Sequence, residues 1–180
     1  LKELCGLPAE TEWVEFKHNA DVEKIGEYIS ALANSAALLG KQTAYLVHGV
    51  DDDTHEVVGT RFKPSQQKHK QQELENWLLQ KLSPKIHFRF HEFLAGAEDD
   101  KPVVILEIQP AAHHPVQFDG VKYIRSGSDK KKLKDFPEKE RELWRVFDKT
   151  PFEQQLAANN IPADKVLQLL EYPAYFDLTG

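Results

Sequence analysis

The chain has 180 residues, of which 41% are hydrophobic and 29% are charged, a composition that predicts one soluble globular domain with a real core. No apolar run approaches the roughly 18 residues that a membrane span needs, and no signal peptide is visible, so we expect no membrane partner. The net charge of −6 argues against general affinity for nucleic acid, and the single Cys5 excludes a disulfide framework and fits the reducing cytoplasm.

The first predicted strand lies at the end of residues 10–17. Its alternation places Val14 and Phe16 on one face and Glu15 and Lys17 on the other. Glu10 precedes Glu15 by five residues, so a straight strand would put the two carboxylates on opposite faces. They converge only if the strand begins after Glu10.

A helix, a buried strand and an acidic turn occupy residues 21–59. The helix is predicted from a 3.6-residue apolar period, with Gly40 as its stop signal. The run 43–50 is apolar enough for a covered strand, and Asp51, Asp52 and Asp53 turn it back into residues 56–59. The apolar face of the helix consists of Ile25, Ile29, Leu32, Ala33, Ala36 and Leu39.

The rest of the chain predicts further helices and hairpins. We expect a polar loop over 61–72, helices over 73–82 and 137–147, and paired strands over 86–93 with 102–108 and over 116–118 with 121–124. The predicted fold class is α+β, with a mixed, mostly antiparallel sheet and flanking helices. Residues 1–148 form the domain, and residues 149–180 form a short helical appendage or linker. Because the chain contains no Met, we expect it to be part of a longer protein.

Carboxylates gather at the start of this fold. Glu10, Glu15 and either Asp51 or Asp52 offer oxygen ligands from separate elements, as Mg²⁺ or Mn²⁺ prefers. Lys17, on the Glu15 face, is placed to neutralise a phosphate oxygen. The alternative is a solvated acidic edge with a Glu–Lys ion pair.

Positive charge gathers late in the chain. Residues 1–60 hold 4 Lys and 11 Asp or Glu, whereas residues 120–145 hold 9 Lys or Arg and 5 Asp or Glu. A Gly/Ser turn flanked by cations allows phosphate to approach backbone N–H groups, and Tyr123 or Phe118 is a candidate for base stacking. The alternative is a solvated lysine-rich loop. The candidate nucleic-acid contacts are Arg125, Ser126, Ser128, Lys130, Lys131, Lys132 and Lys134.

These motifs, in this order, resemble the Schlafen AlbA-type domain, formerly called the divergent AAA family. The resemblance covers about residues 5–147. It rests on Glu10 with Glu15-Phe16-Lys17, residues 29–36, Gly49-Val50-Asp51-Asp52, residues 58–60 and residues 123–128. Such domains are common in bacterial transcriptional-regulator-like and RecG-like helicase-related proteins. The resemblance implies binding of DNA or RNA.

In nuclease-competent Schlafens, two Glu residues and an Asp cleave RNA with a divalent metal. The resemblance places Glu10, Glu15 and Asp52 in these roles, with Asp51 as the alternative for the third. The leading hypothesis is a cytoplasmic nucleic-acid-binding regulatory domain of a transcriptional-regulator-like protein. The alternatives are an endoribonuclease that depends on Mg²⁺ or Mn²⁺, with Lys17 in its catalytic site, and a module for homodimerisation or protein interaction.

Overall fold

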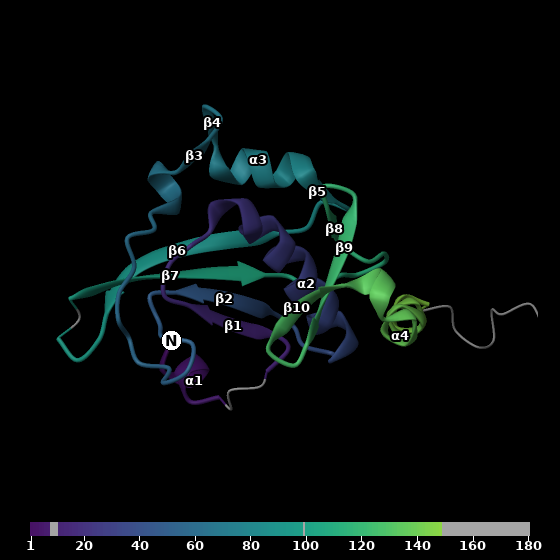
Figure 1. The fold of residues 1–180 in the computed structure, drawn as a ribbon, viewed down its shortest axis with the longest axis horizontal. Coiled ribbons are helices and arrows are strands. Elements are labelled where there is room, and N and C mark those ends of the chain that lie inside the picture. The colour runs from purple at the N-terminus through teal and green to yellow at the C-terminus, as the bar shows by residue number, and fades with distance from the viewer. Residues whose placement is uncertain (8–10, 99, 149–180) are drawn as a thin grey trace, which may run out of the picture. The chain divides into compact units, whose positions relative to one another are not determined.

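A four-stranded mixed sheet forms one half of the fold (Figure 1). In the computed structural model, which describes residues 1–7, 11–98 and 100–148, its first strand runs parallel to the second and the other neighbours are antiparallel. The predicted pairing of the 86–93 and 102–108 strands is confirmed. In spatial order the strands are β1 (Val14–Lys17), β2 (Ala44–His48), β7 (Lys101–Ile108) and β6 (Phe88–Ala95).

A second, antiparallel sheet contains the later hairpin. The predicted hairpin around Asp119-Gly120 is confirmed, and it is joined on each side by a strand that the sequence did not predict. A further two-stranded hairpin, β3 (Lys68–His69) with β4 (Gln72–Glu73), lies where a polar loop was expected. The strands of the second sheet, in order, are β10 (Asp129–Lys132), β9 (Val121–Ser126), β8 (Gln117–Phe118) and β5 (Leu82–Ser83).

The helices confirm the α+β class. The predicted helices over 21–39, 73–82 and 137–147 are present, and the described residues contain no helix long and apolar enough to cross a membrane. The predicted appendage at 149–180 lies outside the described residues, so the domain boundary stays a prediction. The helices are α1 (Lys2–Cys5), α2 (Ile25–Leu38), α3 (Leu74–Lys81) and α4 (Pro137–Phe147), with short 3₁₀ turns η1 (Val22–Lys24), η2 (Pro64–Gln66) and η3 (Leu133–Asp135).

Helix α2 lies where the two sheets meet, in contact with β2 of the first sheet and β8 and β9 of the second (Figure 1). Five of its six predicted apolar residues are buried, whereas Leu39, which follows the last helical turn, is 47% exposed. Gly26 allows a close approach to β8, since a Cβ there would lie 2.0 Å from the Phe118 ring. The apolar face of α2 therefore forms the centre of the core.

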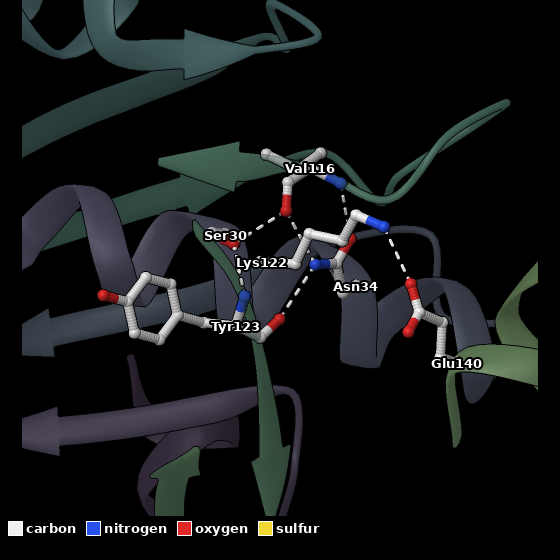
Figure 2. A network of polar contacts seen from close by, with 6 residues as sticks. All are labelled: Ser30, Asn34, Val116, Lys122, Tyr123 and Glu140. Carbon is white, nitrogen blue, oxygen red and sulfur yellow. Dashed lines mark hydrogen bonds and ion pairs between the residues drawn. The ribbon is translucent and has the colours of Figure 1, made fainter. Parts of the chain in front are cut away.

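A row of polar side chains on α2 also joins the helix to the second sheet (Figure 2). Asn34 donates from Nδ2 to the backbone oxygens of Val116 and Tyr123, at 2.9 and 2.8 Å, and accepts from the Val116 N–H at 2.8 Å. Ser30 donates to the Val116 oxygen and accepts from the Tyr123 N–H. Ser35 accepts from the Arg125 N–H at 2.9 Å. These fully buried side chains satisfy backbone groups of β9 and fix its position on α2.

Candidate functional site

A cluster of charged side chains joins the two sheets at the end of β1. Because β1 and β2 run parallel, with Lys17 opposite His48, the turn after β2 begins beside Lys17. The Lys17 ammonium lies 3.1 Å from Glu15 Oε1 and also pairs with Asp52. The Arg125 guanidinium, on β9, pairs with the other Glu15 oxygen. Glu15 and Arg125 are almost fully buried, at 6% and 3% exposed.

The protonation chemistry of this cluster reflects burial. Burial raises the pKa of Glu15 above its ordinary value, although Arg125 and Lys17 both act to lower it. Burial acts to lower the pKa of Lys17, but its hydrogen bond to Asp52 and the attraction of Glu15 outweigh this, and the pKa is raised. Lys17 therefore stays a cation at neutral pH. It is the side chain that holds the two carboxylates together.

The structure distinguishes the two aspartates that the sequence left open. Asp51 accepts hydrogen bonds from the N–H groups of Asp53 and Thr54, at 3.1 and 2.9 Å, so it caps the turn. These hydrogen bonds, led by the one from Thr54, lower the pKa of Asp51. Asp52 is the aspartate that reaches Lys17.

The charged cluster borders a hollow of about 440 Å³. Its polar lining consists of Glu15, Lys17, Asp52, Asp53 and Ser128, so the loop between β9 and β10 reaches it. Ser128, predicted to contact phosphate, is exposed at this carboxylate-rich hollow.

A divalent metal does not fit the described part of this cluster. Both carboxylate oxygens of Glu15 pair with cations, one with Lys17 and the other with Arg125. Asp52 pairs with the same Lys17 ammonium. The described residues contain no group of three His, Cys, Asp or Glu that could hold a metal ion. Glu10 lies outside the described residues, so the three-carboxylate set stays a prediction.

The basic segment, residues 125–134, contains both buried and exposed cations. Arg125 and Lys130 are among the predicted nucleic-acid contacts, but neither side chain is exposed. Arg125 is buried against Glu15, while Lys130 pairs with Glu27 and lies 4.2 Å from the Tyr28 ring centroid. On the hairpin of β9 and β10, Lys130 lies opposite Arg125, so both cations belong to the region next to α2. Their charge is neutralised within the domain.

Three lysines of the segment remain exposed. Lys131 pairs with its neighbour Asp129 at 2.9 Å, and Ser126 is half-buried. Lys132 and Lys134 form no ion pair with any residue in the described part of the chain. They line a second hollow, of about 300 Å³, together with Gly120, Val121, Lys122 and Glu140.

The sequence reasoning missed Lys122, which gives this second hollow a third ammonium. Lys122 Nζ lies 2.7 Å from Glu140 Oε1, so that carboxylate is already paired (Figure 2). The two unpaired lysines leave the hollow with a net positive charge, in a protein whose overall charge is −6. The sequence did show that Lys122 is a cation next to Tyr123. Its partner Glu140 on α4 could not be found from spacing.

The predicted base-stacking residues are not both available. Phe118 is 7% exposed and packs in the core, so the expectation that it stacks on a base is wrong. The Tyr123 hydroxyl donates to Glu27 at 3.1 Å, and burial together with the Glu27 carboxylate raises the pKa of Tyr123 to about 12. Its ring also lies 5.6 Å from the Lys130 ammonium.

Fold and site together define the class of this protein. It is a small α+β domain with a neutralised charged cluster and a separate net-positive hollow. The chain belongs to the Schlafen AlbA_2 family, whose model matches residues 10–134. At the level of the family, this match supports a nucleic-acid-related domain.

Solved structures provide a more distant comparison. The DIP2311 protein from Corynebacterium diphtheriae is 14% identical, with a TM-score of 0.43, over 68% of this chain and 22% of its own. The chain thus spans about a fifth of the length of that structure. Comparison with curated proteins gave no match.

Proposed function

We propose that this domain binds nucleic acid, and that the segment Lys131–Lys134 contributes the phosphate contacts. The observation that carries the proposal is the pair Lys132 and Lys134, exposed and without an acidic partner in the described part of the chain. Cations that are not neutralised internally are available to a polyanion, and they release counterions from it on binding. Family membership supports the same ligand class.

The proposal concerns a local contact and not the whole surface. The −6 net charge repels a polyanion from most of the molecule, so binding depends on the few lysines that face outward together. Arg125 and Lys130 have structural roles in this account, because Glu15 and Glu27 already neutralise them. A role in transcriptional regulation is the finer form of the proposal.

The test is a triple variant in which Lys131, Lys132 and Lys134 are changed to Ala. Each phosphate contact contributes about tenfold or less near physiological salt, so affinity for DNA and RNA oligonucleotides should fall about 10- to 100-fold. The measurement is fluorescence anisotropy at a fixed salt concentration.

The matched control changes Lys63, Lys68 and Lys85 to Ala. These lysines are also exposed, so the control alters the net charge equally at other places on the surface. The control should lose less than about threefold in affinity, which corresponds to a general charge effect of well under 1 kcal/mol. Equal losses in the two triple variants would contradict the proposal.

The other two functions stay predictions. Convergence of Glu15, Lys17 and Asp52 matches part of the residue set expected of a nuclease, but no step can be derived without a described third ligand. A homodimer is likewise a prediction.

A further inference from the structure

Helix α4 presents a large aromatic side chain to solvent. Its residues Leu143 and Phe147 are buried in the core, whereas Trp144, one position further around the helix from Leu143, is 42% exposed. The indole touches His114 and Phe147 edge-on, with ring centroids 5.6 and 5.9 Å apart. Packing against these two rings leaves 42% of Trp144 exposed, so part of the indole is open to a ligand.

The indole is connected to the net-positive hollow through one lysine. Lys122 Nζ lies 5.9 Å from the centroid of the Trp144 ring and bonds Glu140 on the same helix (Figure 2). Lys122 and Glu140 also line the hollow that contains Lys132 and Lys134. We call Lys122, Lys132, Lys134, Glu140 and Trp144 the Trp144 surface.

This surface has the two features that a flexible nucleic-acid strand uses. Ammonium groups track the phosphates, and an aromatic ring offers a face on which an unpaired base stacks. The carboxylate of Glu140 does not oppose this, because it is bonded to Lys122 at 2.7 Å. In a duplex the bases are stacked on one another, so a surface indole gains nothing from them.

We infer that the Trp144 surface binds single-stranded nucleic acid, with a base stacked on Trp144 and phosphates held by Lys132 and Lys134. The inference rests on the proposed function and adds the strandedness of the ligand and the stacking residue. A second copy of the chain is the competing occupant of an exposed indole. The unpaired Lys132 and Lys134 of the adjoining hollow disfavour it, because two copies would bring like charges together.

The experiment measures binding of the full chain to three ligands of equal length: a thymidine strand, the same backbone without bases, and a duplex. Trp144→Leu should weaken binding of the thymidine strand about fivefold or more, the loss expected for one stacked base. It should leave the base-free strand and the duplex within about twofold of wild type. Trp144→Phe, which keeps a ring, should recover part of the loss.

The matched control is Phe93→Leu, since Phe93 is an aromatic residue on β6 with a similar exposure of 37%. It should bind all three ligands like wild type. The wild-type protein is measured with the same ligands. It should bind the thymidine strand more tightly than the base-free strand, and this result does not depend on whether Trp144→Leu folds.

The outcomes separate this inference from the proposed function. Binding by the wild type without a preference for bases, or equal binding by Trp144→Leu and Phe93→Leu, would overturn the stacking role alone. A change of sedimentation coefficient in Trp144→Leu with unchanged affinity would assign the surface to a second copy instead. Absence of binding to every ligand by the wild type would overturn both proposals.

Discussion

The buried pair of Glu15 and Arg125 illustrates what single residues contribute to this domain. A carboxylate and a guanidinium at 6% and 3% exposure lose their hydration, and their contact with each other, together with the Lys17 ammonium beside Glu15, offsets that loss. The alternation in β1 was enough to predict that Glu15 and Lys17 share a face, and their 3.1 Å contact confirms it. Arg125 comes from the other sheet, so no spacing within the sequence connected it to Glu15.

His48 gives a prediction at the same scale. Its ring is 2% exposed and packs edge-on against Phe62, and burial lowers its pKa from 6.5 to about 4. Since the unfolded chain takes up the proton more readily, this neutral ring stabilises the fold above pH 6.5 and the stabilisation is lost as pH falls toward 4. The loss between pH 7 and pH 5 should be about 2 kcal/mol.

The measurement is urea unfolding at the two pH values for wild type and His48→Gln. The variant carries no titrating ring, so its free energy of unfolding should fall by about 2 kcal/mol less between pH 7 and pH 5 than that of wild type. The exposed His113→Gln variant serves as the control and should follow wild type. Parallel pH profiles for wild type and His48→Gln would show that burial of the ring does not shift its titration.

At the scale of elements, helix α2 fills the core with its apolar face and holds β9 with its polar side chains, and only the first role could be predicted from the sequence. Its apolar period predicted a core helix and its stop at Gly40, which has a φ of +62°. The polar residues Ser30, Asn34 and Ser35 appeared only as part of a family motif. Their role became visible once β9 was found against the helix, because their partners are backbone groups about 80 to 90 residues away in the chain.

Strand β10 was missed for a similar reason. Its sequence, Asp129 followed by three lysines, has no apolar alternation, so nothing local distinguishes it from a solvated loop. Pairing with β9 defines it instead, with Lys132 opposite Tyr123. The division of the strands into two sheets depends on such long-range pairing and was not predictable from local periodicity.

Asn34→Ala tests the element scale. The change removes three hydrogen bonds of a fully buried side chain and leaves backbone groups of Val116 and Tyr123 without this partner. We expect the free energy of unfolding to fall by about 2 to 4 kcal/mol, measured by urea denaturation. Asn76→Ala on α3 is the control, because Asn76 is exposed, and it should change stability by less than about 0.5 kcal/mol. Similar losses in the two variants would contradict a structural role for the α2 polar row.

At the scale of the whole molecule, most of the positive charge in the late segment is neutralised before any ligand arrives. Arg125 pairs with Glu15 on β1 and Lys130 pairs with Glu27 on α2. The other paired cations of residues 120–145 are Lys122, Lys131, Lys139 and Arg141. The sequence predicted the charge asymmetry correctly but not which cations would remain free. Composition records charge, whereas availability depends on the neighbours that the fold provides.

The salt dependence of oligonucleotide binding tests the central claim most directly. The logarithm of the association constant should fall linearly with the logarithm of salt concentration, by about 0.7 for each phosphate neutralised on a single strand. Changing Lys132 and Lys134 to Ala should therefore reduce the slope by about 1.4 relative to wild type. Identical slopes for wild type and variant would contradict the claim that these two lysines hold the phosphates.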